Sequence, residues 1–94
     1  MLLMREQEIE TLSCKLAETL GWIPFKGFSR NGGADRIFIK NGYCFFVEFK
    51  TQKGKLRKNQ EREQELAKLN GTKYYVVRSF EEFVEILKEE SQDG

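Results

Sequence analysis

The sequence predicts one small α/β domain, in which a mixed central sheet has helices on both faces and the element order is α-β-β-β-α-β-α. Two observations support this fold class. Apolar residues recur at helical spacing near both ends of the 94-residue chain. Between them, two apolar runs flank Asn41-Gly42, a pair typical of a two-residue hairpin turn. We expect a single domain over residues 1–94, with residues 91–94 as a flexible tail.

The first half of the chain predicts a helix followed by three strands. The helix is expected over residues 4–20, because an apolar stripe of Ile9, Leu12, Leu16 and Leu20 runs up to Gly21. Strands are predicted over residues 22–28, 34–40 and 43–50, and Pro24 limits the first to an edge position or an irregular start. The second and third are apolar on both faces, so we expect them to be central and covered on both sides.

The second half predicts a helix, a strand and a last helix. Residues 56–69 are helical in composition and end at Asn70-Gly71, while residues 74–77 form a short buried strand. Ser79 and Glu82 have the spacing of a capping box. A last helix therefore follows, with its apolar stripe formed by Phe80, Phe83, Val84 and Leu87.

The absence of histidine limits the chemistry that the chain can perform, and its charged residues are unevenly distributed along the sequence. The chain has no histidine, which removes imidazole as a general base or metal ligand. The net charge is only +1, yet residues 50–62 carry +5 and residues 81–94 carry −5. A basic stripe of this kind is typical of a surface that meets a polyanion, although a solvated loop would have the same composition.

Cysteine content and hydropathy favour a cytoplasmic protein. Cys14 and Cys44 suit neither a disulfide framework nor a metal knuckle, so we interpret them as free thiols in a reducing compartment. No apolar stretch approaches the roughly 20 residues of a membrane span, so no membrane partner is expected.

The hairpin brings charged residues together on one face. If Asn41 and Gly42 form the turn, Asp35 lies opposite Glu48, and Lys50 projects from the same face as Glu48. Two opposed carboxylates need a cation between them. Such a cluster suits a divalent, oxygen-liganded metal, with Mg²⁺ the best fit. The alternative is a structural network of ion pairs at a strand end.

Four short segments resemble a known nuclease family. They are Gly32-Gly33-Ala34-Asp35-Arg36, Phe46-Val47-Glu48-Phe49-Lys50-Thr51, Gly54-Lys55-Leu56 and Gln60. In this order they resemble the virus-type replication-repair nuclease (VRR-NUC) family of the PD-(D/E)xK nucleases. The resemblance implies a restriction-endonuclease-like core. Ala34 stands where the motif usually has proline, and Arg57 replaces the common capping Ser or Thr, which would leave the next helix poorly capped.

The resemblance also implies the site residues. Asp35 and Glu48 would be metal ligands, aided by the backbone carbonyl of Phe49, and Lys50 would be the catalytic lysine. Gln60 matches the family's glutamine on the helix after the sheet. The acidic residue on the first helix would be Glu8, with Glu6 and Glu10 as alternatives.

The sequence and the resemblance together predict a Mg²⁺-dependent DNA endonuclease in which Mn²⁺ could substitute, with no organic cofactor. Its expected partners are branched DNA, such as four-way (Holliday) junctions, and a second copy of the chain. The residues expected to hold the DNA backbone are Lys26, Arg30, Lys53, Lys55, Arg57, Lys58 and Arg62. The competing interpretations are a non-catalytic nucleic-acid-binding module with a structural acidic cluster, and a small interaction protein whose basic stripe contacts an acidic partner.

Overall fold

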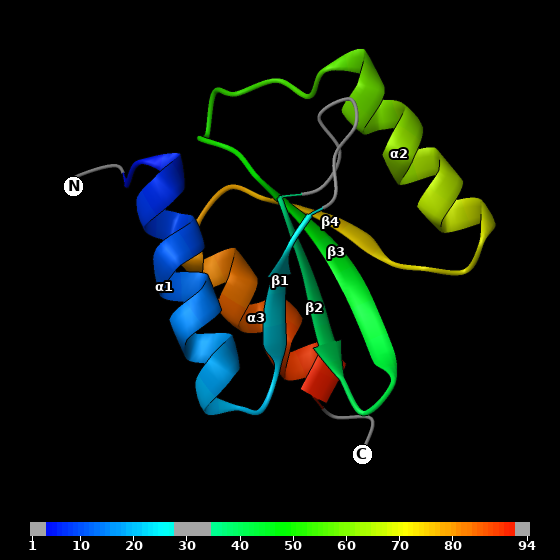
Figure 1. Cartoon of the computed structure of the whole chain (residues 1–94). Helices are drawn as coiled ribbons and strands as arrows, with labels where there is room; N and C mark the ends of the chain where they lie inside the picture. Colours follow the sequence, from blue (N-terminus) through cyan, green and yellow to red (C-terminus); the bar gives the residue numbers. More distant parts are fainter. Residues whose placement is uncertain (1–3, 28–34, 92–94) are drawn as a thin grey trace.

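A computed structural model describes residues 4–27 and 35–91 of the chain (Figure 1). The elements are α1 (Glu6–Thr19), β1 (Ile23–Lys26), β2 (Arg36–Lys40), β3 (Tyr43–Phe49), α2 (Lys58–Leu69), β4 (Tyr74–Val77) and α3 (Phe80–Ser91). This order confirms the predicted one. The expected extensions of the first two strands into residues 28 and 34, and residues 92–94 of the expected tail, lie outside the described residues, whereas Ser91, which we expected in that tail, is the last residue of α3.

The four strands form one mixed sheet in the order β1-β2-β3-β4. β1, β2 and β3 are antiparallel neighbours, and β4 is parallel to β3. The turn between β2 and β3 places both Asn41 (φ 52°) and Gly42 (φ 80°) in the left-handed region, which these residue types tolerate best. The resulting register runs from Lys40 opposite Tyr43 to Arg36 opposite Val47, as predicted.

The hydrophobic core lies on the face of the sheet that α1 and α3 cover. Phe38, Phe45 and Phe49 point into it from the sheet and are fully buried together with Phe83 of α3. The rings of Phe38 and Phe45 stack with their centroids 5.3 Å apart, and Phe83 lies 5.1 Å from Phe38. These contacts hold the sheet against α3.

The buried face of α1 differs from the expected leucine stripe. Its buried residues are Ile9, Ser13, Cys14 and Ala17, whereas Leu12 and Leu20 are 41% and 45% exposed. Small side chains at Ser13 and Ala17 allow the helix backbone to lie close to its neighbours, which a leucine-lined face would prevent. The helix is therefore rotated relative to the sequence-based expectation.

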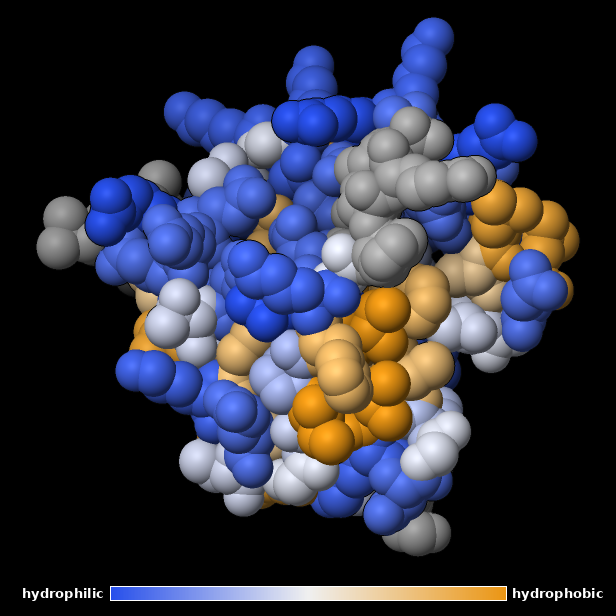
Figure 2. Space-filling model, in the orientation of Figure 1, coloured by the Kyte–Doolittle hydropathy of each residue, from blue (hydrophilic) through white to orange (hydrophobic). Residues whose placement is uncertain are grey.

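The other face of the sheet is covered only in part, which corrects the expectation that the hairpin is buried on both sides. Helix α2 packs against β4 and leaves much of β1 open, so that Ile23 is 54% and Phe25 is 52% exposed. Their sheet partners Ile39 and Ile37 are half-buried on the same face. Figure 2 shows the result as a hydrophobic patch over the strands.

A buried carboxylate joins the end of α3 to the sheet. Glu90 is 7% exposed and accepts hydrogen bonds from Tyr75 (2.7 Å), Lys73 (3.0 Å) and Tyr43. Burial alone would raise the pKa of Glu90, but these three donors together hold it below its ordinary value. Of the helices in the described part of the chain, none is long and apolar enough to cross a membrane.

Candidate functional site

Three carboxylates meet at the end of the sheet where β3 leads into the basic loop. Glu6 comes from the first turn of α1, Asp35 precedes β2, and Glu48 lies on β3. Each offers a carboxylate oxygen, and the three oxygens lie within 4.8 Å of one another. Carboxylates this close repel each other unless a cation or protons intervene, and oxygen ligands are what hard divalent cations prefer.

Glu48 is the most constrained of the three carboxylates. Its side chain is 2% exposed. Its Oε2 accepts a hydrogen bond from Gln60 Nε2 at 2.7 Å and lies 3.7 Å from Lys50 Nζ. Its Oε1 is buried and has no hydrogen-bond partner within the described residues. A buried oxygen without a donor is costly unless a ligand completes it, so this atom fits a cation.

In the absence of a metal, the surroundings raise the pKa of both Asp35 and Glu48. Burial, and then the neighbouring charge of Asp35, raise the pKa of Glu48 to about 7, against the opposing effect of Lys50. Burial likewise raises the pKa of Asp35, although its Oδ2 accepts a 2.8 Å hydrogen bond from the backbone N–H of Phe49. A bound divalent cation would reverse this preference.

The first helix contributes Glu6, not Glu8. Glu8 is half-exposed, and its Oε1 accepts hydrogen bonds of 3.1 Å from both the backbone N–H and Nε of Arg5. These hydrogen bonds cap α1, and they lower the pKa of Glu8. Glu10 pairs with Arg36, whose Nε lies 2.6 Å from Glu10 Oε2. Glu6 was only an alternative in the sequence interpretation, and it is the helix carboxylate that joins Asp35 and Glu48.

Gln60 connects the helix after the sheet to the cluster. It is buried, and its side chain bridges Glu48 and the start of α2, because its Oε1 accepts the backbone N–H of Arg57 at 2.9 Å while Nε2 donates to Glu48. The expectation that Arg57 leaves α2 poorly capped is therefore wrong: the cap comes from Gln60, three residues into the helix.

Cations surround the loop between β3 and α2. The exposed ones are Lys53, Lys55, Arg57, Lys58 and Arg62, and Lys26 is also exposed at the end of β1. Arg30 lies outside the described residues. Arg78 holds the loop in place, because its Nη1 donates to the carbonyls of Thr51 (2.8 Å) and Gly54 (2.5 Å). Figure 2 shows hydrophilic side chains projecting from this end of the molecule.

Comparison with solved structures relates this arrangement to a known domain. The chain is similar to a structure described as "VRR_NUC domain", with a TM-score of 0.78 and 25% sequence identity over 88% of this chain and 94% of that chain. The chain has the VRR-NUC fold. The resemblance identified from the four sequence segments is thereby confirmed. No family model matches the chain, and none of the curated proteins searched matches it.

A VRR-NUC fold makes this chain a nuclease-type domain, a hydrolase class that acts on DNA. Nucleases of this kind generally use divalent metal ions, and the buried acidic group of Glu6, Asp35 and Glu48 has the residue types to hold one.

Proposed function

We propose that this VRR-NUC domain is a Mg²⁺-dependent endonuclease that hydrolyses phosphodiester bonds in branched DNA, including four-way junctions, as one domain over residues 1–94. The observation that carries the proposal is the convergence of Glu6, Asp35 and Glu48 beside Lys50. The unpartnered Oε1 of Glu48 favours a cation over a purely structural ion-pair network, because such a network would satisfy both oxygens.

The metal ligands in this proposal are Glu6, Asp35 and Glu48, together with the backbone carbonyl of Phe49. When bound there, Mg²⁺ or Mn²⁺ would supply Lewis acidity and a more acidic water. The protein positions these ligands itself: the N–H of Phe49 fixes Asp35, and Gln60 fixes Glu48 with Oε1 left free. The same arrangement accounts for the absence of histidine, since carboxylates and a lysine suffice for this chemistry.

Lys50 is the catalytic lysine of this proposal. Its side chain is 12% exposed, and Nζ lies 3.7 Å from Glu48 Oε2. An ammonium group held at the edge of the carboxylate cluster can stabilise the negative charge that develops on the phosphate in the transition state, and can orient the attacking water. Glu48 positions Lys50 through this direct contact, and Gln60 does so indirectly, through its hydrogen bond to Glu48.

The DNA backbone is expected to lie along the exposed cations of the β3–α2 loop and the start of α2. They contact phosphates, which gives affinity without reading base sequence. Recognition by the shape of branched DNA suits a small domain whose cations flank a single cluster.

A homodimer is supported by the open face of the sheet. On this face, the exposed Ile23 and Phe25 of β1 lie beside partly buried residues of β2 and β3, which are Ile37, Ile39, Cys44 and Phe46. None of these six positions carries a charge. A second copy would offer the same uncharged face, so pairing about a two-fold axis buries apolar surface on both sides. Two copies would also bring two carboxylate clusters to one DNA junction.

A cleavage assay tests the proposal. Purified protein is incubated with linear, flapped and four-way DNA, each with Mg²⁺, Mn²⁺ or EDTA. We expect metal-dependent cleavage, with the highest rate on branched DNA, and loss of cleavage in Asp35→Ala and Glu48→Ala. The matched control is Glu8→Gln, which alters a carboxylate of α1 outside the cluster and should retain activity. Binding of DNA without metal-dependent cleavage of any substrate would instead favour the non-catalytic binding module.

A further inference from the structure

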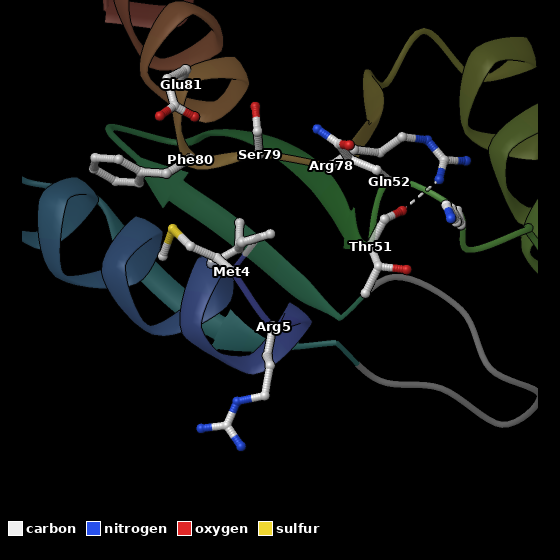
Figure 3. Close-up of a pocket in the computed structure, with 10 residues that line it drawn as sticks. Met4, Arg5, Thr51, Gln52, Arg78, Ser79, Phe80 and Glu81 are labelled. Atoms are coloured by element: carbon white, nitrogen blue, oxygen red, sulfur yellow. Dashed lines mark hydrogen bonds between the residues drawn. The ribbon is translucent and has the colours of Figure 1, made fainter. Parts of the chain in front are cut away.

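A cavity of about 450 Å³ lies between segments that adjoin the carboxylate cluster in sequence, and no role assigned above accounts for it. It opens between the start of α1, the loop after β3 and the junction of β4 with α3 (Figure 3). Ten of the described residues line it. Two of them adjoin the site in sequence, since Arg5 precedes Glu6 and Thr51 follows Lys50.

One side of the cavity is apolar. Met4 and Phe80 are half-buried there, and Ile9, which is 2% exposed, is the most buried lining residue. Figure 3 shows Met4 and Phe80 on one side of the cavity and Thr51 and Gln52 on the other. A volume of this size lies within the range of small-molecule sites and far exceeds that of a single water.

The opposite wall is polar and is held in place by a hydrogen-bonded arginine. Figure 3 shows the Arg78 side chain extending toward Thr51, whose carbonyl accepts its hydrogen bond of 2.8 Å. A second bond, to the Gly54 carbonyl, fixes the same loop. The lining charges are two cations, Lys53 and Arg78, against one acid, Glu81, because the Arg5 side chain pairs with Glu8 and extends away from the cavity in Figure 3. The cavity therefore combines an apolar side with a cationic surrounding.

We propose that this cavity takes an unpaired nucleobase of the DNA strand, next to the phosphate that is cut. A nucleotide has the matching chemistry, because its base is flat and apolar on both faces while its phosphate is anionic. Stacking on an aromatic side chain such as Phe80 needs no particular base sequence. A paired base cannot enter without leaving the duplex, so the cavity would select for junctions, flaps and gaps. The inference rests on the proposed nuclease function and gives it a structural basis for selecting branched DNA.

The test measures binding in EDTA, so that no DNA is cut. Two duplexes of one sequence are compared, one fully paired and one with a single unpaired 2-aminopurine. We expect wild-type protein to bind the unpaired DNA about 5- to 150-fold more tightly, the factor that corresponds to about 1–3 kcal/mol of stacking, and to quench its fluorescence. Phe80→Leu keeps the apolar volume but removes the aromatic face, and should lose most of this preference.

Met4→Glu is the second variant, and because Met4 packs against the core, its thermal unfolding is measured first to establish that the variant is folded. It should lose the preference, whereas Leu20→Glu, which adds the same charge at the other end of α1, should keep it. Equal binding of both DNAs by wild type, or an unchanged preference in Phe80→Leu and Met4→Glu, would overturn the inference. Cleavage with Mn²⁺ is measured separately: a preference for the unpaired base without any cleavage would support the cavity and contradict the nuclease.

Discussion

Replacing Glu48 by glutamine should stabilise the metal-free protein while it abolishes catalysis. Glu48 is 2% exposed, and burial together with Asp35 raises its pKa to about 7. Glutamine has nearly the same shape, can still accept the hydrogen bond from Gln60, and cannot ionise. The variant therefore removes the charge that the folded protein holds at a cost in the absence of a metal.

The size and sign of this effect follow from the pKa. A rise from the ordinary value of 4.5 to about 7 corresponds to about 3 kcal/mol. Because the folded state holds the proton more tightly than the unfolded chain, this carboxyl favours folding fully below pH 4.5, and that contribution is lost as the pH rises through 7. Loss of the Lys50 contact reduces the gain, so we expect Glu48→Gln to be more stable by about 2 kcal/mol at pH 8.

The assay is urea unfolding of wild type and Glu48→Gln in EDTA at pH 5, 6.5 and 8. The difference in the free energy of unfolding between the two proteins should grow with pH. In thermal unfolding at pH 8, the Tm of Glu48→Gln should be higher than that of wild type by roughly 8–16 °C for a domain of this size. Adding Mn²⁺ should stabilise wild type and leave the variant unchanged. The matched control is Glu8→Gln, which removes an exposed capping carboxylate and should gain nothing. The reasoning is refuted if the difference between wild type and Glu48→Gln does not change between pH 5 and 8.

Three further predictions concern catalysis, assembly and DNA binding. Lys50→Met should reduce the cleavage rate about 10²- to 10³-fold while Mn²⁺ still binds at pH 8; full activity in this variant would exclude Lys50 from catalysis. Phe25→Glu should convert the dimer to a monomer in analytical ultracentrifugation, whereas Leu12→Glu, at another exposed hydrophobic residue on α1, should not; an unchanged dimer would place the interface elsewhere. Lys55→Gln should lower the slope of log affinity against log salt by about 1 for every DNA sequence, and an unchanged slope would show that Lys55 contacts no phosphate.

The part of the site that comes from the hairpin, Asp35, Glu48 and Lys50, could be predicted from the sequence. A hairpin with a two-residue turn has only one register. Asn41-Gly42 fixes the pairing of Lys40 with Tyr43, and alternation along the strands then decides which side chains share a face. Asp35, Glu48 and Lys50 follow from that geometry. Gln60 could also be predicted from the sequence, since it shares a helical face with Ala67. Both residues are buried in the structure.

The helix end of the site could not be predicted in the same way. Successive residues of a helix are about 100° apart, so Glu6 and Glu8 point in very different directions. Which of them reaches the sheet depends on how α1 is rotated, and the leucines suggested the wrong rotation. Ser13 and Ala17, both fully buried, lie seven and eleven residues after Glu6 and so share its face. A stripe of small residues was the signal that could have identified Glu6.

The partly open sheet face and the cavity beside the site depend on where α2 and the β3–α2 loop lie. Period-2 patterning shows that both faces of β2 and β3 are apolar, but not whether a helix covers each of them. Helix α2 packs against β4, and Ile23 and Phe25 stay exposed. The cavity likewise exists because Arg78 fixes a loop that is 24 to 27 residues away in sequence.

The measurement that tests the central claim most directly is Mn²⁺ binding by isothermal titration calorimetry at pH 8, on wild type, Glu6→Gln and Glu8→Gln. If Glu6, Asp35 and Glu48 hold the metal, wild type and Glu8→Gln should bind Mn²⁺ with the same affinity, and Glu6→Gln should bind it about tenfold or more weakly. Equal binding by Glu6→Gln and wild type, or no binding by wild type, would contradict the assignment of this cluster as a metal centre.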